Sequence, residues 1–150
     1  MDKNTKLIES FFDAYEQRFS DSLGSENIDI EEQADAFSEC FIGANPNGVQ
    51  CVKNDREFKA NTPALYKFYQ SIGTKSMKLV SKNITLLNEY HALVKTNWVT
   101  QITKKDNSVV TIVFDNFYLV QILNEKVKIF AYITDDEQKV LKEHGIAPYK

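Results

Sequence analysis

The sequence predicts an α+β fold in which a curved antiparallel sheet wraps around N-terminal helices and a short helix ends the chain. Two observations predict it. In the N-terminal half, apolar residues recur every three or four positions, as amphipathic helices require. From residue 78 to residue 133 the period changes to two, the spacing of β-strands. The 150 residues, 43% of them hydrophobic, are enough for one buried core. We therefore expect a single domain over residues 1–150.

Two helices are predicted first. The helix over residues 6–19 has one apolar stripe, formed by Leu7, Ile8, Phe11, Phe12, Tyr15 and Phe19. The second helix begins at the capping residue Asp29, carries an apolar side up to Phe41 and stops at Gly43. The segment GANPNG, residues 43–48, follows as a turn because Asn-Pro and Asn-Gly both favour turns.

A hairpin and a third helix are expected next. The segments 49–53 and 56–60 alternate like strands, with Asn54 and Asp55 as their turn. The following helix covers residues 61–73, where Pro63 fits the first turn and Gly73 the end.

Four long strands and a final helix complete the prediction. The strands cover residues 77–87, 91–104, 108–122 and 126–133, and turn-forming residues separate them. The last helix begins near Thr134, which has capping-box spacing with Glu137, and closes at Gly145.

Composition excludes several functions. The net charge of −3 and the pI near 5.4 argue against binding nucleic acid, which needs clustered basic residues. No stretch approaches the length of a membrane span, and the N-terminus does not resemble a signal peptide, so we expect a cytoplasmic protein. Cys40 and Cys51 are predicted to be reduced, and neither they nor His91 and His144 have the spacing of a metal site. No metal and no cofactor are expected.

The strand VVTIVFDNFYLVQIL is apolar at odd and even positions, so both its faces should be covered. The helices would cover one face. A second subunit would cover the other, which predicts a homodimer through the sheet face. The alternative is a strand at the centre of a monomer, shielded by its neighbours.

Asp115 is the leading functional candidate, because it lies in that strand among Val113, Phe114 and Phe117. Burial there would raise its pKa towards neutrality. Alternatively, it is a structural carboxylate that receives a hydrogen bond from Tyr69 or from a backbone N–H.

Other candidates have two interpretations each. Asn45 belongs to the predicted turn, and its amide could also face a cavity and bind a ligand carbonyl or hydroxyl. Trp98 shares a strand face with Thr96 and Thr100 and lines either a cavity or the dimer interface. Tyr15 offers a hydroxyl from the first helix or is simply part of the core.

Three short strings and the order of the elements resemble the nuclear transport factor 2-like superfamily, whose members include ketosteroid isomerases, polyketide cyclases and dehydratases. In the isomerases, a catalytic carboxylate follows the second helix in a Glu-Asp-Pro-x-Gly string. The corresponding string here is ANPNG, so Asn45 stands where the resemblance implies the base. The string FDNF matches the Asp-x-Phe of the oxyanion hole at Asp115, and KFY places the supporting tyrosine at Tyr69. The essential tyrosine of the first helix falls at Phe11 or Phe12, which have no hydroxyl.

The resemblance therefore implies a cone-shaped fold without isomerase chemistry, since an amide cannot act as a general base near neutral pH. We expect a non-catalytic pocket that binds a small apolar molecule carrying a carbonyl or hydroxyl. Aromatic side chains, Phe12 and Phe41 among them, would form its apolar walls, and Asn45, Tyr69, Asp115, Tyr15 and Trp98 would complete the site. One alternative is a cyclase- or dehydratase-like enzyme with Asp115 as general acid and base. Another is a protein-interaction module that uses the outer sheet face.

Overall fold

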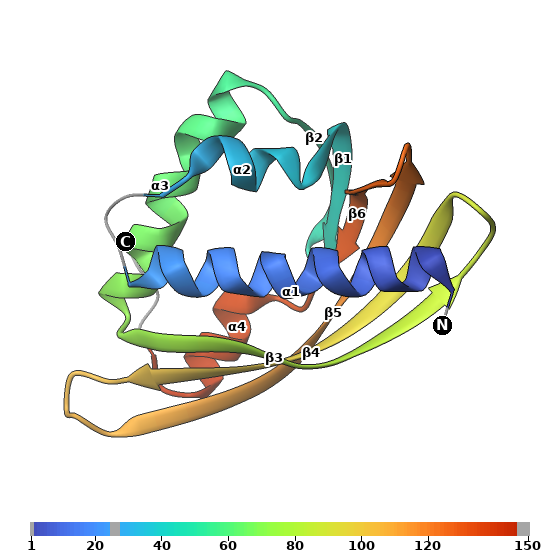
Figure 1. Cartoon of the computed structure of the whole chain (residues 1–150). Helices are drawn as coiled ribbons and strands as arrows, with labels where there is room; N and C mark the ends of the chain where they lie inside the picture. The colour runs from blue at the N-terminus through green and yellow to red at the C-terminus, as the bar shows by residue number, and fades with distance from the viewer. Residues whose placement is uncertain (1, 25–27, 147–150) are drawn as a thin grey trace.

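The computed structural model describes residues 2–24 and 28–146. Figure 1 shows a curved sheet with helices gathered against it. The elements in chain order are α1 (Lys3–Leu23), α2 (Ile30–Asp35), β1 (Phe37–Asn45), β2 (Gly48–Lys53), α3 (Arg56–Ser71), β3 (Thr74–Leu86), β4 (His91–Thr103), β5 (Val109–Leu123), β6 (Lys126–Ile133) and α4 (Glu137–Glu143). The predicted α+β class is confirmed, and the four long strands expected between residues 77 and 133 are all present.

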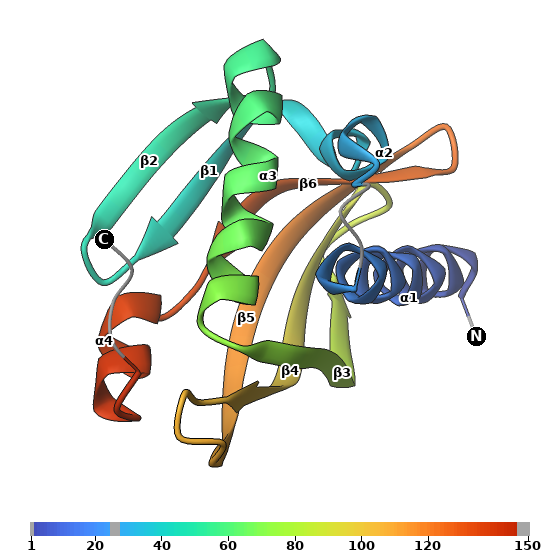
Figure 2. The same ribbon diagram turned by 90° about the vertical axis from the view of Figure 1, so that its left-hand side faces the viewer.

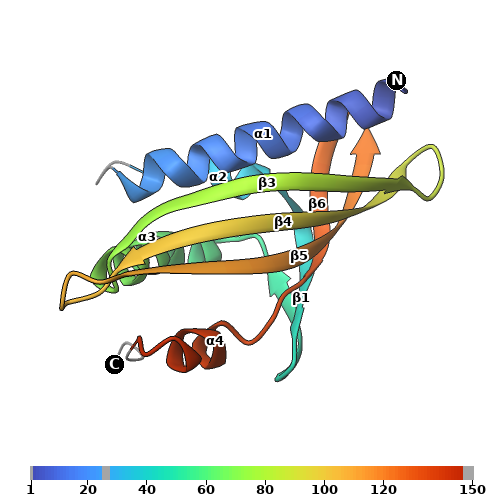
Figure 3. The ribbon, with the colours of Figure 1, turned by 90° about the horizontal axis from the view of Figure 1, so that it is seen from below.

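The sheet has the order β2-β1-β6-β5-β4-β3 and is not closed into a barrel. Neighbouring strands run antiparallel, except that β1 pairs with β6 in parallel. The sheet is therefore mixed, with one parallel pair in the otherwise antiparallel sheet that the sequence predicts. Figure 3 shows how β3, β4 and β5 run together beneath α1 before the sheet bends away.

The helices cover the face towards which the sheet curves, as Figure 2 shows for α1, α2 and α3. Hence that inner face carries two hydrophobic clusters. In the first, Ile8 and Phe12 of α1 pack against β4, β5 and β6 through Val94, Val120 and Ile129, all fully buried. In the second, Leu141 of α4 packs with Ile102 of β4, Ile112 of β5 and partly buried side chains of α3. No helix among the described residues has the length and hydropathy needed to cross a membrane.

The predicted second helix is much shorter in the structure. It ends at Asp35, and the residues that follow form β1. The error has a simple origin, because Phe37 and Phe41 are four residues apart. This spacing puts two side chains on one face of a helix and equally on one face of a strand. Pairing with β2 and β6 on both sides decides in favour of the strand.

The hairpin also lies elsewhere. Its strands are β1 and β2, which meet at the pair formed by Asn45 and Gly48, so GANPNG contains the hairpin turn. The predicted strand over residues 56–60 is the beginning of α3. The side chain of Asp55 accepts a hydrogen bond from the backbone N–H of Phe58 at 3.1 Å and so caps that helix six residues earlier than expected. Pro63 therefore lies inside the helix rather than in its first turn.

Candidate functional site

A cavity of about 660 Å³ lies between the helices and the inner face of the sheet. Most of its lining is apolar or aromatic and comes from α1, β1, α3, the central strands and α4. The aromatic lining residues are Tyr15, Phe19, Phe37, Phe41, Phe58, Tyr66, Tyr69, Trp98, Phe114, Tyr118 and Tyr132. A volume of this size and a lining of this composition are typical of sites for small organic molecules.

The structure brings five predicted site residues to this lining: Tyr15, Phe41, Asn45, Tyr69 and Trp98. The two alternatives for Trp98 are thereby resolved in favour of the cavity. Its indole Nε1 donates to Thr96 Oγ1 at 2.8 Å, which fixes the orientation of the ring. A role of these residues in ligand binding stays a prediction.

Phe12 is not part of the lining. Its side chain is fully buried in the first hydrophobic cluster, and its ring centroid lies 5.1 Å from that of Tyr118. The expectation that Phe12 forms part of the cavity lining was wrong, because the residue supports the cavity wall from behind.

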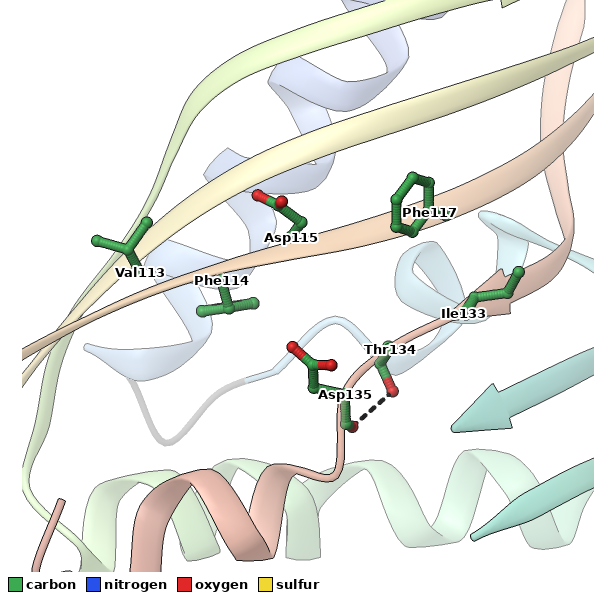
Figure 4. Close-up of a pocket in the computed structure, with 7 residues that line it drawn as sticks. All are labelled: Val113, Phe114, Asp115, Phe117, Ile133, Thr134 and Asp135. Carbon is green, nitrogen blue, oxygen red and sulfur yellow. Dashed lines mark hydrogen bonds between the residues drawn. The ribbon is translucent and has the colours of Figure 1, made fainter. Parts of the chain in front are cut away.

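Asp115 lies on the opposite face of β5 from the cavity, and the expectation that it faces the cavity was wrong. It borders a separate hollow of about 350 Å³ on the outer face, together with Val113, Phe117 and Asp135 (Figure 4). Asn97 Nδ2 donates to the carboxylate, and Lys95 Nζ lies 3.8 Å from it. The side chain is about two-fifths exposed. The enzyme alternative in its original form, with Asp115 as the acid and base of the cavity, has no geometric support.

Asn116 occupies the position on β5 that does face the cavity. Its Nδ2 donates to the hydroxyl of Tyr118 at 3.3 Å. The ring centroids of Tyr118 and Tyr15 lie 6.0 Å apart. Burial raises the pKa of the Tyr118 hydroxyl. Burial, and then the nearby Tyr118 hydroxyl, hold the pKa of Tyr15 well above its ordinary value. Both phenols therefore stay protonated at neutral pH and can donate hydrogen bonds.

A carboxylate does reach the cavity, from the first residue of α4. Glu137 Oε2 accepts a hydrogen bond from the hydroxyl of Tyr69 at 3.0 Å. Burial raises the pKa of Glu137, and the bond from Tyr69 lowers it by less. The pKa of Tyr69 is held well above its ordinary value by burial and by the adjacent Glu137 charge. This pair is a titratable couple in the cavity that could exchange a proton with a ligand.

The hairpin turn explains the amides of ANPNG. Asn45 Oδ1 accepts from the backbone N–H of Asn47 at 2.8 Å, and Asn47 Nδ2 donates to Asp136 Oδ2 at 3.1 Å. Asp136 in turn caps α4, and its pKa is lowered by the backbone N–H of Lys139 and then by Asn47. An amide at position 47 donates to this carboxylate, as a second carboxylate could not, and so links the turn to the start of α4.

A chain of hydrogen bonds satisfies the polar groups between α1, α2 and α3. Tyr66 Oη donates to Gln33 Oε1 at 2.9 Å, Gln33 Nε2 donates to Ser22 Oγ at 2.7 Å, and Ser22 Oγ donates to the carbonyl of Arg18 at 2.8 Å. The Arg18 guanidinium lies 3.6 Å from Glu32. These side chains are thus committed to one another and hold the helices around the cavity.

Sequence reasoning missed Glu137 as a site residue, as well as Asn116 and Tyr118. A signal existed for the two strand residues. The polar Thr111 and Gln121 share their strand face with Asp115, whereas the other face carries the apolar residues of the core. For Glu137 no such signal existed, because a glutamate in the first turn of a helix is common.

Comparisons with known proteins agree with this architecture. A family model described as NTF2-like protein (DUF6841) matches residues 3–137. None of the curated proteins matches significantly. An NTF-2 like protein of unknown function from Shewanella oneidensis superimposes with a TM-score of 0.63 at 18% identity, over 89% of this chain and 99% of that one.

Two further solved structures are similar to the same extent. An NTF2-like protein with a cystatin-like fold from Novosphingobium aromaticivorans has a TM-score of 0.66 at 12% identity, over 87% of this chain and 80% of that one. A ketosteroid isomerase-like protein from Erwinia carotovora atroseptica has a TM-score of 0.63 at 14% identity, over 90% of this chain and 97% of that one. At such low identity these likenesses show the fold alone.

Proposed function

Since the chain belongs to the NTF2-like protein family DUF6841, whose model matches residues 3–137, we propose that it uses the interior of this fold to bind a small, mostly apolar molecule. The observation that carries the proposal is the cavity of about 660 Å³ with its aromatic lining. Apolar walls supply the affinity in such sites, and a few polar groups select the ligand.

A carbonyl or hydroxyl of the ligand has partners in the wall formed by Tyr15, Asn116 and Tyr118. The hydroxyls of Tyr15 and Tyr118 also hydrogen-bond to each other, which leaves one O–H of the pair to donate, and the Asn116 amide can donate and accept. Asn45 offers a ligand only the donors of its Nδ2, because its side-chain oxygen already accepts from the Asn47 N–H in the turn. This arrangement supports recognition of a polar group rather than proton transfer at Asn45.

A second candidate function is acid–base catalysis of the cyclase or dehydratase kind. The observation that favours it is the hydrogen bond of 3.0 Å between Tyr69 and Glu137, together with the raised pKa of Glu137. In this candidate Glu137 takes the role first assigned to Asp115. Chemical conversion of a bound ligand, lost in Glu137→Gln, would favour the enzyme over the binding protein.

Two neighbouring residues of β5 provide the test of binding. Asn116 faces the cavity, and Asp115 faces outwards. Asn116→Phe would fill the cavity with a ring, whereas Asp115→Phe would add the same ring to the outer face. We expect the neutral dye Nile red to bind the wild type and Asp115→Phe, and its affinity to fall about ten-fold or more in Asn116→Phe. Equal affinities for the two variants, or no binding to the wild type, would refute the proposal.

We also propose that the protein forms a homodimer through the outer sheet face. Val113 and Ile133, 69% and 49% exposed, border the outer hollow with Phe117 and are apolar surface that a second copy would cover. Sedimentation velocity should show a dimer that Val113→Lys dissociates. A monomer in both cases would refute the dimer, and capture of another protein by this face would favour the interaction module.

A further inference from the structure

One wall of the cavity combines a carboxylate with aromatic rings. Glu137 Oε2 accepts from the Tyr69 hydroxyl at 3.0 Å. The Tyr69 ring centroid lies 5.6 Å from that of Phe19 and 6.4 Å from that of Tyr66, and all three rings line the cavity. The faces of aromatic rings attract organic cations, and a carboxylate beside them adds a direct ionic partner.

Among the described residues, no basic side chain pairs with Glu137. Arg18 is the one basic side chain of the described residues that lines the cavity, and it pairs with Glu32. Within residues 2–24 and 28–146, none of the ion pairs includes Glu137 or the adjacent Asp135 and Asp136. The field in this part of the cavity therefore favours a positively charged ligand.

Glu137 is in part exposed to solvent, and desolvation by the surrounding cavity wall still raises its pKa, so a bound cation would stabilise the ionised form. No cation among the described residues supplies this stabilisation. The titratable groups that face the cavity with Glu137 are Tyr15 and Arg18 of α1, Tyr66 and Tyr69 of α3, Tyr118 of β5, Tyr132 of β6, and Asp135 and Asp136 before α4.

An organic cation fits this wall better than a metal ion. Nowhere in the part of the chain that the structure describes do three acidic, histidine or cysteine side chains gather as a metal site requires. Asp136 is already bound to Asn47 and to the backbone of α4. The remaining acidic and phenolic donors beside Tyr69 are the carboxylates of Glu137 and Asp135 and the Tyr69 hydroxyl, and two carboxylates fall short of a metal-binding set.

We propose that the molecule bound in the cavity is an amphiphilic amine. Its protonated nitrogen pairs with Glu137 and lies beside the Tyr69 ring, while its apolar part fills the aromatic lining. This inference rests on the proposed binding function and specifies its ligand class. A ligand hydroxyl or carbonyl can still bind to Tyr15, Asn116 and Tyr118.

Two matched probes test the inference by isothermal titration calorimetry: 4-phenylbutylamine, a cation at neutral pH, and the neutral 4-phenylbutanol. We expect the wild type to bind the amine about ten-fold more tightly than the alcohol, and Glu137→Gln to reduce this ratio to about one. Asp115→Asn removes a carboxylate from the outer face and should leave the ratio unchanged. Tyr69→Phe keeps the ring and the carboxylate and should retain the preference for the amine.

The pH dependence of the affinity provides a second, independent test. Affinity for the amine should rise as the pH rises through the pKa of Glu137, whereas affinity for the alcohol should not. An alcohol that binds as tightly as the amine, or a preference that survives in Glu137→Gln, would overturn the inference and leave the proposed function standing. If neither probe binds while Nile red does, the inference fails alone; if the wild type does not bind Nile red, the proposed function fails and the inference fails with it.

Discussion

Phe12 should stabilise the fold without contacting a ligand, and Phe12→Ala tests this in quantitative terms. The side chain is fully buried, with ring centroids of Phe11, Tyr118 and Tyr15 at 5.0, 5.1 and 6.0 Å. An aromatic side chain buries about 150–250 Å². At about 25 cal/mol per Å², burying the ring contributes about 4–6 kcal/mol. Part of that surface remains in alanine, so we expect a loss of about 3–5 kcal/mol in the free energy of unfolding.

Urea denaturation followed by circular dichroism measures this loss, which corresponds to a fall of about 6–20 °C in Tm for a chain of this size. Phe117→Ala, on the half-buried outer face, is the matched control and should cost less than half as much. Phe12→Leu provides a milder variant if the alanine protein does not fold. A cost below about 1 kcal/mol for Phe12→Ala would refute the assignment of this residue to the core.

Two other substitutions test the structure at single sites. Gly73 has φ of +89°, and a Cβ there would lie 2.0 Å from the carbonyl oxygen of Thr103. Gly73→Ala should therefore lower the free energy of unfolding by about 1–3 kcal/mol in thermal melts. Gly24 has an ordinary φ and no close contact, so Gly24→Ala should change this free energy little. Equal losses in the two variants would contradict the geometry at Gly73. Because the pKa of Glu137 is raised, the folded protein binds the carboxyl proton more tightly than the unfolded chain does. The stability that this proton contributes is therefore lost as the pH rises from the ordinary value of 4.5 through the folded pKa. Glu137→Gln should match the wild type below that window and become relatively more stable above it. A difference in unfolding free energy that does not change with pH would contradict the raised pKa of this carboxyl.

The spacing of apolar residues predicted most of the fold, because in the long strands and the amphipathic first helix this spacing recurs many times. Short elements were less certain. The four-residue spacing of Phe37 and Phe41 fits a helix and a strand alike, and only pairing with β2 and β6 separates the two. The capping of α3 by Asp55 was missed because Pro63 offered a more familiar start.

The candidate site was predicted in part. Tyr69 and Trp98 reach the cavity, but Asp115 does not, since a shift of one residue along a strand reverses the direction of the side chain. The pattern of polar residues Thr111 and Gln121 indicated the outer face for Asp115. The Tyr69–Glu137 pair joins residues far apart in the sequence, and only the docking of α4 beside α3 brings them together.

The central claim is that the cavity takes up a small organic molecule, and Trp98 reports on it most directly. It is the single tryptophan of the chain and lines the cavity, so its indole N–H gives one assignable signal in a ¹H–¹⁵N spectrum. We expect titration with 4-phenylbutanol to shift this signal saturably, while the backbone signal of the outward-facing Val113 stays in place. An unmoved indole signal at saturating probe, or shifts confined to the outer face, would contradict the account.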